Sequence, residues 1–347
     1  MHSPIFEGYF EIKKIFSMSN KVSIILLSYN QADYIEEALK SVFKQTHKNW
    51  ELVISDNGSN DGTDQILKNY ADDPRVKLLL YDSNEFVTKR SNQALNEASG
   101  DFISILYGDD YYLPNKIEEQ VNCFKNLSQD WGVVHGPGYN LEQFTQTKSI
   151  EKVLKAHGDA LKDILMYYFI KGFINPISPL VRRECFKKYP FYEDLFTEGE
   201  SIYMRLSLSY KFFYMDEPLV VMREHDKNAR WFSKRNIEIQ DKCLERLGEY
   251  KEFPEDCISE LSKLRSQTYN IGAWENIRLS KSMDVSYIRS RIHKAFKQDP
   301  LKSISLKNFL VLVLTLFPDF VRKIFNAFLN YLTKKEKSIY FDDSFIK

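Results

Sequence analysis

The stretch VSIILLSYNQADYIEEALKSVFKQTHKNWELVISDNGSNDGT, residues 22–63, decides the fold. It opens on a near-continuous run of β-branched and apolar residues at 22–27, whose length is typical of a buried strand. Apolar residues then recur at helical spacing from Ile35 to Phe43, and 51–54 is a second apolar run. The stretch therefore predicts a strand, a helix and a second strand in succession.

The same alternation continues along the chain. Further strands are predicted at 76–81, 102–106 and 131–135, with helices at 87–98 and after Pro114. Strands that alternate with helices form a parallel sheet covered by helices on both faces. We therefore expect an α/β domain of Rossmann-like type, with a mixed, mostly parallel sheet flanked by helices.

Later segments carry a weaker pattern. Residues 136–185 mix loops and helix, a helix is predicted to start near Glu200, and two further strands are predicted at 212–215 and 219–222. From residue 231 onward the chain is charged and helical in pattern. The predicted organisation is an N-terminal extension (1–20), a catalytic domain (21–230) and a helical C-terminal region (231–347).

Composition excludes one class of partner. The 347 residues carry 48 Lys and Arg against 48 Asp and Glu, so no global positive field draws the protein to nucleic acid. The four cysteines have no C-x-x-C spacing, which indicates thiols of a reducing compartment. The N-terminus has acids at Glu7 and Glu11 and is not a secretory signal, so we expect a cytoplasmic protein, with peripheral contact to the inner face of a membrane left open.

Three polar clusters follow predicted strands. They are Tyr29 with Asn30, residues 56–61, and Asp109 with Asp110. Ligands of parallel α/β sheets bind beyond the carboxyl ends of the strands, so we expect all three clusters to meet at one crevice.

The acidic pair Asp109 and Asp110 suits a metal site. The glycine-rich phosphate signatures G-x-x-x-x-G-K-[ST] and G-x-G-x-x-G are absent from the sequence. Two carboxylates at a strand end can instead hold a divalent cation that bridges a diphosphate. An isolated Asp-Asp more often begins a turn, but here a buried-type strand precedes it and two other polar clusters face it.

Three segments together resemble family 2 glycosyltransferases of the GT-A fold. Residues 22–63 resemble the opening of that family, NEASGDFISILYGDDYYLP (96–114) resembles the segment with its DxD metal motif, and YMRLSLSYKFFYMDEPLVVMREHDKN (203–228) resembles the end of its catalytic domain. The resemblance covers about residues 21–230. It implies an inverting hexosyl- or N-acetylhexosaminyltransferase. The donor would be a nucleotide diphosphate sugar, a UDP-sugar above all, and the acceptor a hydroxyl of a glycan or lipid-linked acceptor in surface polysaccharide synthesis.

The resemblance also implies roles for matching positions. Asp109 and Asp110 would hold Mn²⁺ or Mg²⁺ against the diphosphate, and His225 would be a further metal or phosphate ligand, unless it is a surface histidine. Lys89 or Arg90 would reach the diphosphate, although such charges more often face solvent. The positions expected to contact the nucleotide are Ser28, Tyr29, Asn30, Asp56, Asn57 and Asp109.

Three positions depart from the family pattern. Tyr107 stands where the first acid of DxD would be, which leaves the ribose contacts open, and Asn57 replaces a common Asp. The family keeps a catalytic Glu-Asp pair shortly before a helix arginine, here Arg205, whereas this chain has Glu198 and Glu200 on either side of Gly199.

The proton of the acceptor hydroxyl needs a base, and a carboxylate can accept it. Glu200 is the first candidate, because Gly199 can turn the chain toward the sheet, and Glu198 is the other. Either acid could instead belong to a solvated helix N-terminus. Only one of them is expected to be the base, since residues two apart do not face the same way on a helix.

The C-terminal region carries an apolar run at 309–314, which is broken at Pro318, and an amphipathic pattern over 320–332 followed by lysines at 334, 335 and 337. Two interpretations remain open: an interfacial helix on anionic lipid, or a packing or oligomer helix.

Two functions of the protein remain open as well. Asp109, Asp110, Glu200 and His225 favour an active transferase, while Tyr107 and Gly199 favour a catalytically silent GT-A domain that binds a nucleotide sugar or a partner.

Overall fold

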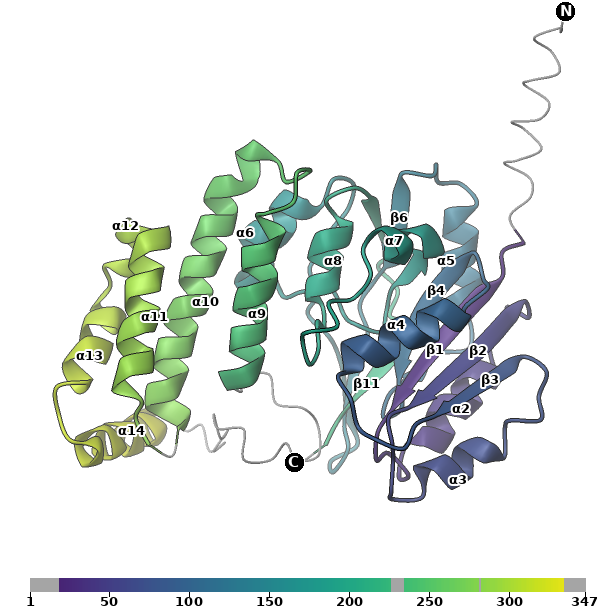
Figure 1. The fold of residues 1–347 in the computed structure, drawn as a ribbon, viewed down its shortest axis with the longest axis horizontal. Helices are drawn as coiled ribbons and strands as arrows, with labels where there is room; N and C mark the ends of the chain where they lie inside the picture. The colour runs from purple at the N-terminus through teal and green to yellow at the C-terminus, as the bar shows by residue number, and fades with distance from the viewer. Residues whose placement is uncertain (1–18, 226–233, 281, 334–347) are drawn as a thin grey trace, which may run out of the picture. The chain divides into compact units, whose positions relative to one another are not determined.

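The computed structural model describes residues 19–225, 234–280 and 282–333 (Figure 1). These residues form two compact units, the first from 19–160 and 169–225, the second from 161–168 and the described residues after 233. The boundary predicted at 230 and nearly all of the predicted N-terminal extension lie outside the described residues. No helix in the described ranges is long and apolar enough to span a bilayer.

The first unit is built on a seven-stranded sheet (Figure 1). Its strand order is β10-β6-β9-β4-β1-β2-β3, and β9 runs antiparallel to both neighbours while the other pairs are parallel. The predicted mixed, mostly parallel sheet is confirmed. The strands are β1 (Val22–Ser28), β2 (Trp50–Asp56), β3 (Val76–Leu80), β4 (Phe102–Tyr107), β6 (Trp131–His135), β9 (Leu180–Arg182) and β10 (Lys211–Tyr214).

Helices pack against this sheet because its central strands are buried along their length. All seven residues of β1 are buried, and Ile24 and Leu26 belong to the same core as Ile35 and Leu39 of the following helix. Burial of each such side chain contributes about 1.5–3 kcal/mol to the hydrophobic term of folding. The helices of the first unit are α2 (Ile35–Phe43), α3 (Thr63–Lys68), α4 (Val87–Glu97), α5 (Lys116–Phe124), α7 (Arg183–Lys188) and α8 (Ser201–Leu206).

A second, four-stranded sheet lies beside the end of β4. Its order is β5 (Tyr111–Tyr112), β11 (Val220–Glu224), β7 (Tyr139–Glu142), β8 (Thr147–Ile150). Because β5 directly follows Asp109 and Asp110 and pairs with β11, the acidic turn is held against a strand more than a hundred residues further along the chain.

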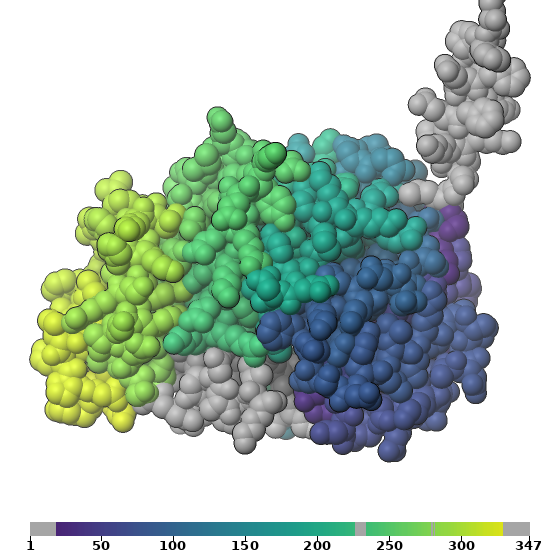
Figure 2. All heavy atoms as spheres, in the orientation of Figure 1, coloured from purple at the N-terminus to yellow at the C-terminus, as the bar shows by residue number. Residues whose placement is uncertain are grey.

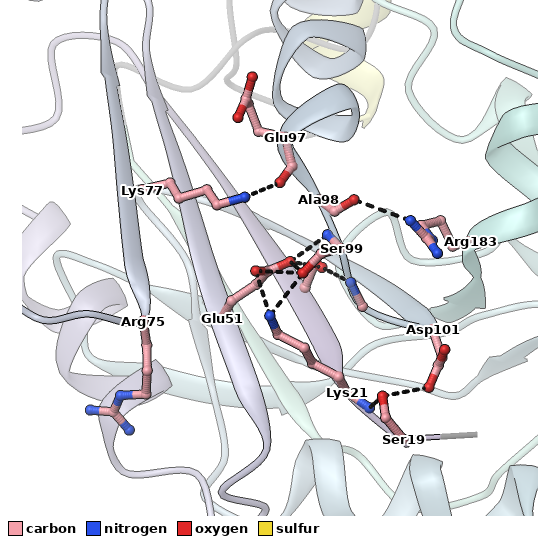
Figure 3. Close-up of polar contacts among 12 residues, drawn as sticks. Ser19, Lys21, Glu51, Arg75, Lys77, Glu97, Ala98, Ser99, Asp101 and Arg183 are labelled. Carbon is pink, nitrogen blue, oxygen red and sulfur yellow. Dashed lines mark hydrogen bonds and ion pairs between the residues drawn. The ribbon is translucent and has the colours of Figure 1, made fainter. Parts of the chain in front are cut away.

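A buried polar network links the amino-terminal ends of the central strands β1, β2 and β4, at the end of the sheet opposite to the acidic turn (Figure 3). At the start of β2, Glu51 accepts hydrogen bonds from Lys21 Nζ at 2.7 Å, Ser23 Oγ at 2.5 Å and the Ser99 amide at 2.5 Å. Gly100 lies against this network, where a side chain would meet the backbone of Ser23 at 2.6 Å. Burial by itself raises the pKa of Glu51, but these hydrogen bonds outweigh it and hold the pKa at about 2, below the ordinary 4.5.

This network predicts an acid-dependent loss of stability. A pKa that is lower in the folded than in the unfolded chain stabilises the fold above the unfolded value and ceases to do so as the pH falls through the folded value. The free energy of unfolding of the parent should therefore exceed that of Glu51→Gln most above about pH 4.5, and the gap should shrink as the pH falls toward 2. Urea melts of both proteins across this range measure the gap, and a gap that widens toward low pH would contradict the assignment.

The second unit is helical (Figure 1). Its small core contains Ala273, Ile277, Ile288, Ile292, Val311 and Leu314. A buried ion pair between Arg291 and Asp241 joins two of its helices, and Arg291 also donates to the carbonyl of Thr268 at 2.7 Å. The helices are α9 (Lys234–Leu247), α10 (Ile258–Leu279), α11 (Val285–Gln298), α12 (Pro300–Ser303), α13 (Leu306–Leu314) and α14 (Asp319–Thr333), with residues 161–168 of α6 (Leu161–Lys171).

Large apolar side chains lie exposed on the last three helices, which form part of the surface of this unit in the space-filling view (Figure 2). On α14, Phe320, Ile324 and Phe328 recur every four residues and are 57–65% exposed. The other exposed large apolar residues between the start of α12 and the start of α14 are Leu301, Ile304, Leu306, Phe309, Leu312, Leu316 and Phe317. We call this set of ten residues the apolar face.

Candidate active site

The three predicted polar clusters lie at one end of the central sheet. The strands β1, β2 and β4 are parallel neighbours, and their register pairs Ser28 with Asp56 and Leu27 with Tyr107. Their carboxyl ends therefore finish side by side, which confirms that the clusters converge on one edge.

Asp56 is a fixed, buried carboxylate. It accepts hydrogen bonds from Ser28 Oγ at 2.8 Å, Ser59 Oγ at 2.6 Å and the Ser59 amide at 2.9 Å. The turn that supplies these donors requires Gly58, whose φ is +80° and whose Cβ would meet the backbone of Ser83 at 2.9 Å. The local sequence thus fixes the carboxylate at the end of β2, whereas its predicted contact with a base stays a prediction.

The two residues after β1 differ in their surroundings. Tyr29 is 38% exposed, so its ring faces solvent at the sheet edge. Asn30 has a positive φ of +51° and joins two loops: its amide donates to Ser59 Oγ, and its side-chain oxygen accepts from the Asn60 amide, both at 2.9 Å.

Asn57 and Arg90 support the loop beside the site. Asn57 donates to Asn84 Oδ1 and to the Glu85 carbonyl, and its Oδ1 accepts from Arg90 Nε at 2.8 Å. Arg90 is buried, stacks on Tyr81 at 3.5 Å and donates to the Ser83 carbonyl. These bonds hold the loop at residues 83–85 in place, so the structure gives both residues a supporting role.

Lys89, the other predicted diphosphate contact, is 40% exposed on α4. It lies 3.5 Å from Glu85, one helical turn earlier, as the alternative of a solvated face predicts. Its contact with the diphosphate, like that of Arg90, stays a prediction.

Asp109 and His225 meet at this edge. His225 Nε2 lies 3.3 Å from Asp109 Oδ2, and the imidazole stacks on Tyr34 at 4.5 Å. Arg223, two residues before His225 on β11, holds the turn: its amide donates to Asp110 Oδ1 at 2.9 Å and its Nε donates to the Asp109 carbonyl at 3.1 Å. The second sheet thus brings the imidazole to the acidic pair.

The two carboxyl groups of the acidic pair lie close enough to repel each other when both are ionised. Burial and the neighbouring Asp109 carboxylate raise the pKa of Asp110 well above its ordinary range. Burial and the charges of Asp110, Glu200 and Asp109 likewise raise the pKa of the Tyr107 hydroxyl. Neighbouring carboxylates that repel one another in this way are a site where a cation would be stabilised.

The residues fit a divalent cation that shares its coordination with a substrate. Among residues 19–225, 234–280 and 282–333, no three His, Cys, Asp or Glu side chains are grouped so as to hold a metal by themselves. Mg²⁺ at phosphate-transfer sites takes only one or two carboxylates and completes its shell with phosphate oxygens and water. Asp109 and His225 match such a partial set, while Asp110 is buried and its Oδ1 already accepts from the Arg223 amide.

Glu198 is a structural acid. Its Oε1 accepts from Arg205 Nε at 2.7 Å, and its Oε2 accepts from Arg205 Nη2 at 2.8 Å and from the Tyr192 amide at 2.9 Å. Both side chains are buried, and Arg205 also donates to the Pro190 carbonyl. A carboxylate held on both oxygens by a buried guanidinium is poorly placed to accept a proton, so this geometry weighs against Glu198 as the base.

The ion pair predicts a large stability effect. Glu198→Gln leaves the buried Arg205 charge without its carboxylate, and loss of one partner of a buried pair costs about 3–5 kcal/mol. Denaturant melts should show this loss. If Glu198→Gln is as stable as the parent, the pair does not hold this segment.

Glu200 follows Glu198 across the glycine of the same turn. Gly199 has a φ of +50°, the left-handed conformation that lets it turn the chain as expected. Glu200 then precedes α8, and its charge adds to burial in raising the pKa values of Tyr107, Tyr203 and Glu151. Glu200 therefore lies within electrostatic range of Tyr107, the last residue of β4.

Glu151 is a residue of this region that the sequence did not single out. It directly follows β8, and burial raises its pKa to about 7, with further increases from the charges of Glu200 and Glu224. No motif marks it, because it lies in the segment 136–185 without a readable pattern.

Comparison with known families assigns most of the first unit to one class. Residues 23–189 match the family model described as glycosyl transferase family 2. This match contains β1, β2 and β4 together with the acidic pair. Through its first unit, the chain belongs to glycosyl transferase family 2.

Relatives by sequence carry the same class of name. The chain is 26% identical over 245 residues to an uncharacterized glycosyltransferase of Rickettsia typhi, covering 70% of this chain and 73% of the relative. It is 41% identical over 170 residues to an Escherichia coli protein, WfgD, covering 47% of this chain and 66% of the relative. That protein is named UDP-Glc:alpha-D-GlcNAc-diphosphoundecaprenol beta-1,3-glucosyltransferase.

Solved structures show the same fold. Residues 1–349 of S. aureus TarS in complex with UDP-GlcNAc give a TM-score of 0.62 at 16% identity, covering 93% of this chain and 97% of TarS 1–349. A mannosyltransferase from Pyrobaculum calidifontis, in complex with GDP-Man and Mn²⁺, gives a TM-score of 0.53 at 15% identity, covering 94% of this chain and 92% of that one. These likenesses establish a GT-A glycosyltransferase fold with a helical C-terminal part.

Proposed function

We propose that the protein is an inverting, metal-dependent glycosyltransferase that moves a sugar from a UDP-sugar to a hydroxyl of a glycan or lipid-linked acceptor. The observation that carries the proposal is the meeting of Asp109 with His225, with Glu200 nearby, at the carboxyl edge of a family 2 sheet. A cation ligand pair and a separate carboxylate are the parts that such a transfer needs.

The donor would lie along the edge of β1, β2 and β4. Asp56, fixed by Ser28 and Ser59, is a strong acceptor for the N–H of a uracil ring, and the exposed Tyr29 offers an aromatic surface to a base. Asp109 and His225 would hold Mn²⁺ or Mg²⁺, which as a Lewis acid would offset the charge of the leaving diphosphate.

Glu200 would accept the proton of the acceptor hydroxyl. A hydroxyl becomes an adequate nucleophile only as its proton leaves, and a carboxylate within hydrogen-bond reach can accept that proton. Attack from the face opposite the diphosphate inverts the anomeric carbon in one step, so a carboxylate acting as a covalent nucleophile is not required.

The alternative function is a catalytically silent domain, which is favoured by Tyr107 at the first position of DxD. Measurements of nucleotide-sugar binding and of UDP release distinguish an active transferase from such a domain. Thermal melting with UDP-Glc, UDP-GlcNAc and GDP-Man, with and without Mn²⁺, identifies the nucleotide, because a ligand of the folded state raises the melting temperature. Release of UDP under the same conditions then identifies an enzyme. A rise in melting temperature without any release of UDP would favour the silent domain.

We also propose that the protein works at the inner face of a membrane through the apolar face of α12–α14. Exposed phenylalanine and leucine side chains are typical of helices that lie in the lipid interface. Lys302, Lys307 and Lys323 lie on the same helices. The lysines at 334, 335 and 337, which the sequence places after this pattern, lie outside the described residues.

The membrane proposal predicts a loss of lipid binding on substitution of the apolar face. Glutamate at Phe320, Ile324 and Phe328 together should abolish co-sedimentation of the full chain with vesicles of phosphatidylcholine and phosphatidylglycerol, because three charges oppose insertion and repel the anionic surface. Phe144→Glu, at another exposed phenylalanine, is the matched control and should sediment like the parent. If the triple variant sediments as the parent does, or if the parent stays in the supernatant, the apolar face is a packing or oligomer surface instead.

A further inference from the structure

The imidazole of His225 lies against the aromatic ring of Tyr34. The two rings are nearly parallel, with 22° between their planes and 4.5 Å between their centroids. The His225 side chain is only 4% exposed, and its Nε2 lies 3.3 Å from Asp109 Oδ2. Tyr34 therefore contacts the flat side of the imidazole whose edge faces the acidic turn.

Tyr34 is itself held in place at the start of α2. It directly precedes the helix, and its backbone amide donates to the Gln31 carbonyl at 2.9 Å. The residues that follow it pack into the core of the first unit, where Ile35 and Leu39 are fully buried. The backbone that carries the Tyr34 ring is therefore fixed by the core, so the ring is a firm support for its neighbours.

The first turn of α2 also holds the arginine that precedes His225 by two residues. Glu37, three residues after Tyr34, forms an ion pair with the Arg223 guanidinium. The guanidinium carbon of Arg223 lies 5.3 Å from the centre of the Tyr34 ring. Arg223 and His225 thus both rest on the first turn of α2, and each reaches Asp109 from there.

The plane of an imidazole decides where a bound cation can lie. A histidine coordinates a metal ion through the lone pair of a ring nitrogen, and that lone pair lies in the plane of the ring. Rotation of the ring about its bond to Cβ would turn the lone pair away, and a parallel aromatic ring in contact with it hinders this rotation. Removal of the groups that orient a metal-binding histidine lowers metal affinity by about ten- to a hundredfold.

We propose that Tyr34 is a positioning residue that stacks on His225 and so sets the plane of its imidazole for the divalent cation. The proposal rests on the proposed function, because that function makes His225 a ligand of Mn²⁺ or Mg²⁺. Tyr34 acts through the face of its ring, so a phenylalanine can take its place. It also acts through His225, so its contribution disappears when the imidazole is absent.

Manganese binding by the full chain tests both statements. Mn²⁺ is titrated into each protein with UDP in large excess, and electron paramagnetic resonance measures the Mn²⁺ that stays free in solution. Tyr34→Ala should bind Mn²⁺ about ten- to a hundredfold more weakly than the parent, whereas Tyr34→Phe should bind it as the parent does. Tyr70→Ala, which removes another half-buried tyrosine ring, one that contacts Phe43, is the matched control and should also match the parent.

A double variant separates this role from a general structural one. His225→Ala should itself weaken Mn²⁺ binding, and Tyr34→Ala in the His225→Ala background should cause no further loss. An equal loss in that background would mean that Tyr34 acts through Arg223 or the acidic turn, which overturns the proposal. Unchanged Mn²⁺ affinity of the single variant Tyr34→Ala overturns it as well.

A second variant covers the case in which Tyr34→Ala has no cooperative melting transition. Tyr34→Leu fills most of the space without an aromatic face, and it then decides by the same titrations. If the parent binds no Mn²⁺ with UDP, or if His225→Ala binds Mn²⁺ like the parent, the metal site of the proposed function is wrong and this proposal falls with it. Weaker binding by His225→Ala without weaker binding by Tyr34→Ala contradicts the role of Tyr34 alone.

Discussion

Glu200→Gln should lower kcat by about 10²–10⁴-fold while the affinity for the UDP-sugar stays as in the parent. Glutamine has nearly the same shape but cannot accept a proton, so the loss falls on the chemical step. The position supports this expectation: Gly199 turns the chain with a φ of +50°, and the Glu200 charge acts on Tyr107 at the end of β4. Steady-state UDP release gives kcat, and calorimetry gives the donor affinity.

Glu198→Gln is the matched comparison for this experiment, since it makes the same change two residues away. The expected signature is the opposite one: lowered stability through the broken pair with Arg205, with kcat retained by the folded fraction. A Glu200→Gln variant with full kcat would show that Glu200 is not the base. A Glu198→Gln variant that is stable but inactive would show that Glu198 is the base and that Glu200 is not.

Asp109→Asn should abolish the gain in UDP affinity that Mn²⁺ provides. Asp109 faces His225 across 3.3 Å, and an amide oxygen without charge is a poor replacement for a carboxylate ligand of a divalent cation. The variant should also lose turnover. Stabilisation of the leaving diphosphate by such a cation contributes several kcal/mol, which at about 1.4 kcal/mol per factor of ten corresponds to a hundredfold or more in turnover. Calorimetric titration of UDP, in Mn²⁺ and in EDTA, measures the gain.

Asp110→Asn controls for the loss of one negative charge at the same turn. The oxygen of Asp110 that accepts from the Arg223 amide can be replaced by an amide oxygen, so we expect a smaller loss of Mn²⁺-dependent affinity than for Asp109→Asn. Equal UDP affinity of Asp109→Asn and the parent in Mn²⁺ would exclude Asp109 as a metal ligand. A larger effect at Asp110 would make that residue the main ligand.

The strands that form the site could be predicted from the sequence because they are buried on both faces. A run such as Val22–Ser28 has no polar alternation, and its apolar character alone places it in the centre of a sheet. Once three such strands are parallel, the residues after them must share an edge. Tyr29, Asp56 and Asp109 were therefore accessible to sequence reasoning before any coordinates.

The second sheet could not be predicted in the same way. All four residues of β8 are exposed, so no hydrophobic pattern marks the strand, and β5 has only two residues. The pairing of β11 with β5 and with β7 depends on contacts between segments far apart in the sequence. Glu151, which follows β8, was missed for this reason, and so was the role of Arg223 in holding the acidic turn.

The choice between the two acids around Gly199 also needed the structure. The sequence places both beside the same glycine, but it does not show that Arg205 reaches back seven residues to Glu198.

In the C-terminal region, the break at Pro318 between α13 and α14 followed from the sequence. The grouping of residues 161–168 with the second unit did not, because it depends on packing that no local pattern encodes.

The anomeric form of the sugar released from a UDP-sugar tests the central claim most directly. Without an acceptor, water can take the acceptor's place, and proton NMR can follow the sugar before it equilibrates between anomers. For UDP-α-D-glucose or UDP-α-D-GlcNAc with Mn²⁺, the account predicts UDP and the β-anomer as first products, with neither formed in EDTA or by Asp109→Asn. Release of the α-anomer first would contradict the inverting mechanism, and the absence of UDP release from every nucleotide sugar tried would contradict the enzyme itself.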